Sequence, residues 1–306
     1  MYKRILLPLD SSSCSEQTVR WGLDFAAALS AEVTFLHVLE VSTGLLGSLP
    51  TGARYLSDLL RDMRAAGKRS LEQAKTEADL RGVACDAYML EDEVPAHAIL
   101  EAEKAHHLTL MATHSRRGVD RLFLGSVTEA VLRHSEKPHL ILRCPDEKAL
   151  PTSPAQSGFE QLLLPTDGSR CSDHALDEGL HLAKALGARV VLLHALEVPV
   201  SVYTMPDSMV YEPGIREEAK KAAQETLQKA RQRADELGVE AAVRLVDSPE
   251  LHADQAIAEA ETGVDLTVMG THGRRGLNRL MLGSVTERVL RRSPTPHLVV
   301  RCPKAT

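Results

Sequence analysis

The second half of this chain repeats the first, and that duplication constrains the fold more than any other feature of the sequence. Residues 5–40 align without gaps to residues 162–197, and residues 115–145 align to residues 273–303 with identity at 21 of 31 positions. The offset of 157 residues between the copies far exceeds the ~20–50 residues of repeats that stack as a solenoid. We therefore expect two tandem copies of one domain.

The boundary between the copies is visible in the composition. The chain has 306 residues, which allows two domains of roughly 150 residues each. The stretch 146–158, DEKALPTSPAQSG, is rich in Pro, Ser and Ala and has no apolar period, as is typical of a linker. We predict a first domain at residues 1–145, a linker at 146–158 and a second domain at 159–306.

Each copy alternates short apolar runs with longer amphipathic segments. Continuous apolar runs are typical of strands that are buried on both faces of a parallel sheet. In the first copy the expected strands are Arg4–Leu9, Glu32–Leu39, Ala84–Leu90, Leu108–Ala112 and His139–Arg143. In the second copy they are Gln161–Pro165, Arg189–His194, Glu240–Val246, Leu266–Met269 and His297–Arg301. Five strands alternating with helices predict an α/β fold of two doubly wound domains, each with a five-stranded parallel sheet.

The overall composition argues against several classes of partner. Apolar residues make up 43% of the chain and charged residues 25%, which is ordinary for a globular protein. The net charge of −6 gives no electrostatic reason to expect nucleic acid or an anionic membrane as a partner. No apolar run approaches the ~18 residues of a membrane-spanning helix, and the N-terminus lacks the features of a signal peptide. We therefore expect a cytoplasmic protein.

The five cysteines form no recognisable framework, since their number is odd and no Cys-x-x-Cys motif occurs. Cys14 and Cys171 occupy equivalent positions in the two copies, as do Cys144 and Cys302, and duplication alone explains both correspondences. We expect all five, including Cys85, to be free thiols, as is usual in a reducing compartment.

The segment 270–286, GTHGRRGLNRLMLGSVT, follows the fourth strand of the second copy and has the features of a phosphate site. Gly270 and Gly273 open this loop, and glycine lets a phosphate approach the backbone without a Cβ in the way. Gly283 precedes a helix, whose unpaired first amides and dipole favour an anion. In doubly wound sheets, ligands bind at the carboxyl ends of the strands, which is where this loop lies.

The start of this helix also carries hydroxyl groups that can donate hydrogen bonds to a phosphate. The hydroxyls of Ser284 and Thr286 are placed to bind phosphate oxygens. We expect Gly283→Val to abolish nucleotide binding without unfolding the protein, because the side chain would stand where a phosphate must approach the backbone amides.

Each of these residues also has a structural alternative. Ser284 and Glu287 have the spacing of a helix capping box, and Asp167, after the first strand, is placed to cap the first helix. The loop is neither a Walker motif nor a dinucleotide fingerprint, because it lacks both characteristic spacings. His272 is the one evident candidate for a general base, and a single histidine is more often structural. We predict no catalytic residue and no metal site.

The spacing Gly270-x2-Gly273-x9-Gly283-Ser284 resembles the ATP-binding signature of the universal stress protein family. The openings of the two copies, PLDSS and PTDGS, are similar to that family's first strand and turn. The resemblance covers both copies. It implies an adenine nucleotide α-hydrolase-like fold, a ligand that is ATP, ADP or AMP with or without Mg²⁺, and a regulatory role in the stress response.

The same resemblance implies a role for each site residue of the second copy. The residues implied for adenine and ribose are Pro165, Thr166, Asp167 and Ala195. Those implied for the path of ribose and phosphate are Met269, Gly270, His272 and Gly273. Those implied for the phosphates are Gly283, Ser284, Val285 and Thr286.

The first copy departs from the pattern, because Ala112 and Ser115 replace the first two glycines. If the loop needs a positive φ at these positions, a Cβ costs ~1–2 kcal/mol at each of them. We therefore expect the second copy to bind nucleotide more tightly than the first. The site residues of the first copy are Asp10, Val38, Ala112, His114, Ser115, Gly125, Ser126, Val127 and Thr128.

The last strand of each copy is apolar and is expected at a sheet edge, which is a liability unless something covers it. Pairing of His139–Arg143 with His297–Arg301 would cover both edges. We predict that the two domains form an intramolecular pseudo-dimer in this way, as the family resemblance also implies. A homodimer of the whole chain stays open.

Two other functions stay open. One is an enzyme of the wider adenine-nucleotide α-hydrolase group, such as a slow ATPase or an adenylating enzyme. Adenylating enzymes usually carry His-x-Gly-His or Ser-Gly-Gly-x-Asp-Ser loops, and the sequence has neither. The other is a binding scaffold whose ligand is not a nucleotide.

Overall fold

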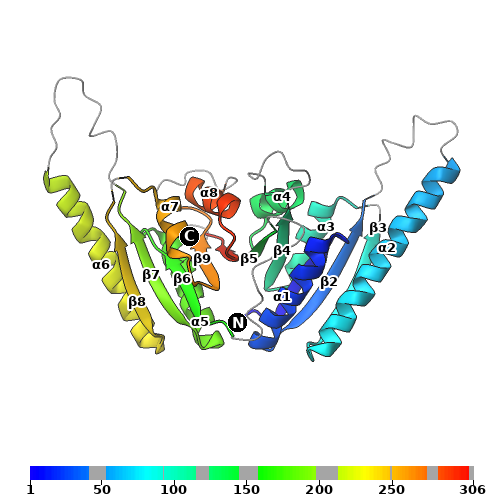
Figure 1. The fold of residues 1–306 in the computed structure, drawn as a ribbon, viewed down its shortest axis with the longest axis horizontal. Coiled ribbons are helices and arrows are strands. Elements are labelled where there is room, and N and C mark those ends of the chain that lie inside the picture. The colour runs from blue at the N-terminus through cyan, green and yellow to red at the C-terminus, as the bar shows by residue number, and fades with distance from the viewer. Residues whose placement is uncertain are drawn as a thin grey trace, which may run out of the picture. The chain divides into compact units, whose positions relative to one another are not determined.

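The computed structural model describes residues 1–40, 53–91, 93–114, 124–144, 158–197, 213–248, 250–273 and 282–302. The chain divides into two compact units, Met1–Gly158 and Phe159–Thr306 (Figure 1). Nearly all of the predicted linker lies outside the described residues. The predicted pairing between the last strands of the two copies stays a prediction, and each unit is described by itself.

The described residues of the first unit form five parallel strands. Their bonded neighbours give the order β3-β2-β1-β4-β5. The strands are β1 (Arg4–Leu9), β2 (Glu32–Leu39), β3 (Cys85–Glu91), β4 (Leu108–His114) and β5 (His139–Cys144). The helices are α1 (Ser13–Leu29), α2 (Ala53–Leu80), α3 (Pro95–Ala102) and α4 (Ser126–His134), with a 3₁₀ turn at Glu103–Ala105.

The second unit repeats this topology, with all strands parallel and in the order β8-β7-β6-β9-β10. The strands are β6 (Gln161–Pro165), β7 (Arg189–Ala195), β8 (Ala241–Val246), β9 (Leu266–Gly270) and β10 (His297–Val300). The helices are α5 (Arg170–Leu186), α6 (Pro213–Leu237), α7 (Ala253–Ala260) and α8 (Ser284–Arg292). The predicted fold class, two doubly wound domains with five-stranded parallel sheets, is confirmed.

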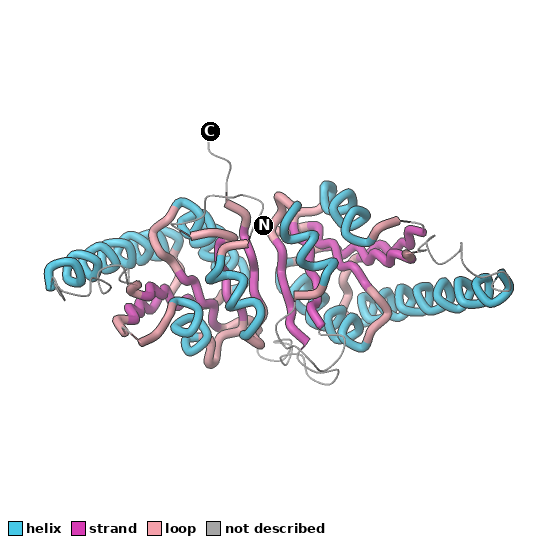
Figure 2. Tube along the Cα trace, turned by 90° about the horizontal axis from the view of Figure 1, so that it is seen from above, coloured by secondary structure: helices cyan, strands magenta, loops and turns pink. Residues whose placement is uncertain are grey.

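Helices lie on both faces of each sheet, as Figure 2 shows. In the second unit, alternate side chains of the strands face opposite layers, as the period of two requires. Leu164 and Val268 face Gly179 of α5, whereas Leu163 and Met269 belong to the core on the side of α7 and α8. Within the described ranges, no helix combines the length and the apolar character needed to cross a membrane.

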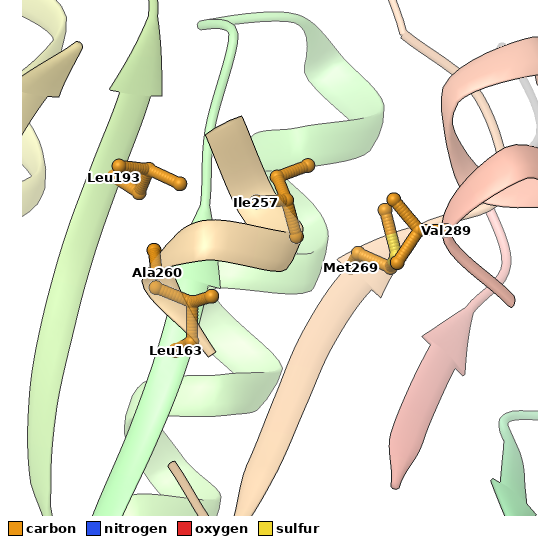
Figure 3. Close-up of a cluster of buried hydrophobic side chains, with 6 residues drawn as sticks. All are labelled: Leu163, Leu193, Ile257, Ala260, Met269 and Val289. Carbon is orange, nitrogen blue, oxygen red and sulfur yellow. The ribbon is translucent and has the colours of Figure 1, made fainter. Parts of the chain in front are cut away.

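The core beneath the carboxyl edge of the second sheet is built from several elements. Side chains of β6, β7, β9, α7 and α8 contact one another there and are almost fully buried. Figure 3 shows this cluster, which consists of Leu163, Leu193, Ile257, Ala260, Met269 and Val289. This packing fixes the end of β9 relative to the start of α8, the two segments that carry the predicted phosphate loop.

The prediction that all the cysteines are free thiols is wrong for four of the five. Cys14 is disulfide-bonded to Cys144, and Cys171 is disulfide-bonded to Cys302. The sequence separations of 130 and 131 residues concealed both bonds. Parallel pairing brings the first helix and the last strand of each copy together, with Cα–Cα distances of 6.1 and 4.6 Å that a disulfide can span. Cys85 is free.

A buried carboxylate–imidazole pair lies at the amino end of the second sheet. Oε1 of Glu261 lies 2.8 Å from Nε2 of His297 and accepts a hydrogen bond of 2.8 Å from Oγ1 of Thr267. Oε2 accepts one from the hydroxyl of Ser293. Burial alone would raise the pKa of the Glu261 carboxyl, but the hydrogen bond and charge of His297, with the two hydroxyl donors, hold this pKa below its ordinary value.

Glu261→Gln is expected to lower the free energy of unfolding of the second unit by about 1.5–3 kcal/mol at pH 7, the contribution of hydrogen bonds to a charged group. Because the native pKa of Glu261 lies below 4.5, this stabilisation is complete above that pH and is lost as the pH falls through the native pKa. Urea denaturation from pH 7 to pH 3 should therefore show the difference between wild type and variant shrinking below about pH 4.5.

The control is Glu259→Gln, an exposed position on α7, which should leave stability unchanged within about 0.5 kcal/mol. Glu103→Gln should destabilise the first unit, because Oε2 of Glu103 lies 3.1 Å from Nε2 of buried His139. A difference between wild type and Glu261→Gln that stays constant down to pH 3 would contradict this account.

Candidate functional site

The turn after β6 presents Asp167 at the carboxyl edge of the second sheet. Oδ1 of Asp167 accepts a hydrogen bond from the amide of Ser169 (3.0 Å), and Gly168 between them has a φ of 72°. The N-cap of α5 is Ser169, whose hydroxyl accepts from the amide of Ser172 (3.2 Å). The alternative that Asp167 caps this helix is therefore wrong, and its carboxylate shapes the turn instead.

The loop after β9 lies directly against this turn. An ideal Cβ built on Gly273 would lie 2.7 Å from Oδ2 of Asp167, so a side chain there would displace the carboxylate. The amide of Thr271 donates to the carbonyl of Val300 (2.9 Å), so the loop is also bonded to the last strand. Two segments about a hundred residues apart in the chain thus meet at the point where the winding of the sheet reverses.

The start of α8 completes the site. The amide of Gly283 donates to the carbonyl of Thr271 (2.7 Å), which holds the helix start on the loop. Gly283 is the N-cap, and no side chain caps the helix, so the predicted capping box with Ser284 is wrong. Ser284 is instead the first helical residue and is exposed. Helix geometry leaves the first amides, those of Ser284, Val285 and Thr286, without partners in the helix.

Some of the predicted binding residues serve mainly to support this edge. The Thr286 hydroxyl is buried and donates to the carbonyl of Gly270 (2.8 Å), so it connects α8 to β9 rather than offering a donor. Met269 is buried in the core cluster, and Val285 packs against it. Buried Thr166 shares a hydrogen bond with the hydroxyl of Ser172 (3.2 Å).

The other predicted residues lie at the ends of the strands and in the loop. Pro165 ends β6 and Ala195 ends β7, and both are half-buried. His272 is half-buried, and its Nδ1 shares a hydrogen bond with the hydroxyl of Thr271 (3.0 Å). The structure therefore brings the residues predicted for the second copy to one edge of one sheet.

The structure favours glycine at positions 270 and 273 for a reason other than the one considered from sequence. Neither has a positive φ. A Cβ on Gly270 would lie 3.0 Å from the carbonyl oxygen of Cys171, and one on Gly273 would meet Asp167. The expected penalty for a left-handed backbone therefore does not apply to these two residues, and close approach between segments takes its place.

Gly283 is also in close contact with the chain. A Cβ there would lie 2.8 Å from the carbonyl oxygen of Thr271 and 3.2 Å from the Cα of His272. A valine would displace the end of β9 before it reached a phosphate. The variant Gly283→Val would therefore disturb the local structure as well as the proposed phosphate site. Loss of nucleotide binding in this variant would not by itself identify the site.

The turn of the first unit uses its aspartate differently. Oδ1 of Asp10 accepts hydrogen bonds from the hydroxyls of Ser12 (2.6 Å) and Ser15 (2.5 Å) and from the amide of Ser12 (3.1 Å). Ser11, which replaces the glycine of the second copy, has a φ of 61°. Burial lowers the pKa of the neighbouring His37 imidazole, although a backbone hydrogen bond at Leu9 and the charge of Asp10 oppose this shift.

The helix start of the first unit also differs. Gly125 has a φ of 73°, and a Cβ there would be 3.9 Å from Oγ1 of Thr128, whereas Gly283 has a φ of −61°. The hydroxyl of Thr128 donates to the carbonyl of Ala112 at 3.4 Å, longer than its counterpart in the second unit. The remaining predicted residues are half-buried Val38 and Val127, exposed Ser126, His114 at the end of β4, and Ser115, which lies outside the described residues.

Sequence reasoning missed the serines that form hydrogen bonds in the two turns, and it missed the disulfide bonds of the cysteines next to those turns. Ser12 and Ser15 in the first copy, and Ser169 and Ser172 in the second, follow the aspartate at the spacing of a helix cap, which was the available signal. For the cysteines, the signal was their equivalent placement in the two copies.

Comparison with known proteins identifies the family. The family model described as the universal stress protein family matches residues 1–143 and 158–301, which is nearly the whole chain. The chain belongs to the universal stress protein family. Both units of this universal stress protein are matched, including the first, in which the glycine pattern is altered.

Curated relatives agree with this assignment, and a solved structure agrees with the fold. A universal stress protein of Mycolicibacterium smegmatis is 27% identical over 301 residues, which cover 97% of this chain and 96% of the relative. Universal stress protein YxiE of Bacillus subtilis is 36% identical over 148 residues, 47% of this chain and 99% of YxiE. The crystal structure of a universal stress protein from Archaeoglobus fulgidus has a TM-score of 0.68 at 21% identity and covers 98% of this chain, with 97% of its own chain covered.

The two turns provide a matched test of backbone strain. Ser11→Gly should raise the free energy of unfolding of the first unit by about 1 kcal/mol, because a Cβ in the left-handed region is unfavourable. Gly168→Ala should lower that of the second unit by a similar amount, since its φ is 72°. Urea denaturation of both variants measures the two shifts. If Ser11→Gly were less stable than wild type, the serine side chain would stabilise the fold by more free energy than its left-handed backbone costs.

Proposed function

We propose that this universal stress protein binds an adenine nucleotide, with ATP as the ligand, at the carboxyl edge of its second sheet. The observation that carries the proposal is the meeting of three segments at that edge: the turn of Asp167, the loop Gly270–Gly273 and the start of α8. In a doubly wound sheet this is the place where ligands bind.

Each segment suits a different part of the nucleotide. The Asp167 carboxylate can accept a hydrogen bond from a ribose hydroxyl or an exocyclic amine. Gly270 and Gly273 let the loop lie close against Cys171 and Asp167, which brings the loop to the edge where the ribose and phosphate are proposed to bind. The first amides of α8, from Ser284 onward, point to where the phosphates would lie, and the helix dipole favours their charge.

Any Mg²⁺ is proposed to arrive with the phosphates. The described residues include no group of three or more His, Cys, Asp or Glu side chains placed to hold a metal ion. Mg²⁺ is commonly bound through substrate phosphates together with one or two carboxylates, so such a cage is not needed.

We propose a regulatory role in the stress response, in the cytoplasm, with at most slow hydrolysis of ATP. His272 is the one candidate base that the sequence offers beside the phosphates, and its Nδ1 shares a hydrogen bond with Thr271. Incubation with Mg-ATP followed by product analysis separates this role from that of a slow ATPase or an adenylating enzyme.

Calorimetry with ATP on a matched pair of variants tests the site. We expect one tight site per chain, weakened about ten- to a hundredfold in Asp167→Asn, because hydrogen bonds to a charged group contribute about 1.5–3 kcal/mol. Asp10→Asn should leave the tight site unchanged, because Asp10 lies in the first unit and the tight site is proposed in the second.

Titrations with AMP, with NAD and without Mg²⁺ define the ligand, and circular dichroism confirms that both variants are folded. The absence of heat with every nucleotide would favour a scaffold for another ligand. Loss of the tight site in Asp10→Asn but not in Asp167→Asn would show that the first unit carries it.

A further inference from the structure

Both disulfides lie at the carboxyl edge of their sheets, against the segments that form the candidate sites. Cys171 is the second residue of α5, immediately after the turn of Asp167, and Cys302 follows β10. In the first unit, Cys14 lies in the first turn of α1 and Cys144 ends β5. The bonded pairs are thus equivalent in two copies that have diverged elsewhere at the same edge.

The disulfide of the second unit encloses the end of β9. The carbonyl oxygen of Cys171 lies against Gly270, so close that a Cβ there would be 3.0 Å away. On the other side, the amide of Cys302 donates to the hydroxyl of Thr271 (3.4 Å). The covalent bond therefore connects the two segments between which the beginning of the phosphate loop is held.

The two disulfides differ in exposure. Cys14 and Cys144 are 3% and 5% exposed, so a reductant has little access to either sulfur. In the second unit Cys171 is buried, but Cys302 is only half-buried. Because thiol–disulfide exchange needs access to a sulfur, the bond of the second unit is the one open to attack.

Cys85 provides the internal contrast. It is the free cysteine of the chain and lies half-buried in β3. Burial is the largest of the effects that raise the pKa of its thiol, which disfavours the reactive thiolate. Its position therefore gives no comparable connection to either site.

We propose that Cys171 and Cys302 form a reversible redox switch that sets the nucleotide affinity of the second unit. The inference rests on the proposed nucleotide function of that unit. With the disulfide formed, the turn of Asp167 and the loop after β9 are held in the arrangement that binds the ligand. With the disulfide reduced, the same segments must be ordered by the ligand, at a cost in affinity.

The exchange partner is a small thiol such as glutathione. Its thiolate attacks the sulfur of Cys302, the bond between Cys302 and Cys171 breaks, and Cys171 leaves as a thiolate that takes up a proton. A second glutathione thiolate then attacks the mixed disulfide. Cys302 is released as a thiol and glutathione disulfide is formed, so that two electrons pass from two glutathione molecules to the protein.

The test is ATP calorimetry on the full chain after equilibration with reduced or oxidised glutathione, with the thiols counted by alkylation and mass spectrometry. We expect Cys171–Cys302 to be reduced under conditions that leave Cys14–Cys144 intact, and the Kd for ATP to rise about tenfold. C171S/C302S should show the weaker Kd in both conditions, whereas C14S/C144S and C85S should respond as wild type does.

Each outcome has a distinct meaning. Equal, tight ATP binding by the oxidised and reduced wild type, with the loss of Cys171–Cys302 verified by mass, would overturn the switch and leave the nucleotide site standing. ATP binding in neither form would overturn the proposed function itself, and the switch with it. Since reduction of the wild type is measured alongside the variants, a C171S/C302S chain that failed to fold would not remove the test.

Discussion

The parallel pairing of β6 with β9 is the contact on which the candidate site depends. It places Leu162 beside Leu266 and Leu163 beside Thr267, although about a hundred residues separate these strands. The chain winds outward from this pair in both directions, so the loops after β6 and β9 leave the carboxyl edge of the sheet in opposite directions. Every group proposed to bind nucleotide lies on, or next to, one of these two strand ends.

Close contact between segments, rather than unusual backbone conformation, distinguishes this edge of the sheet. Gly270, Gly273 and Gly283 each lie where a Cβ would meet another part of the chain within about 3 Å. The buried side chains of Met269 and Thr286 support these contacts from below. The edge is thus held by packing and backbone hydrogen bonds, and the start of α8 and the Asp167 turn both lie at it.

Much of the fold followed from the sequence because its signals are local or repeated. The duplication gave the domain number, and apolar runs such as Glu32–Leu39 gave strands whose observed bounds agree closely. The site residues were located by glycine spacing, but their physical roles were not. Whether Gly270 needs space or a positive φ depends on the position of Cys171, and the pairing of Cys171 with Cys302 depends on the completed sheet. Distances between segments that are remote in the chain cannot be predicted from a local sequence pattern.

The buried pairs of Glu103 with His139 and Glu261 with His297 lie at the amino ends of the strands, opposite the candidate sites. Each pair joins the last strand to the segment that precedes the fourth. These two pairs therefore stabilise each domain at the end of the sheet that lies away from the candidate site. The two copies differ at the binding edge, as at Ser11 and Gly168, but both keep this buried pair. One copy could in this way lose or change its ligand without ceasing to be a folded domain.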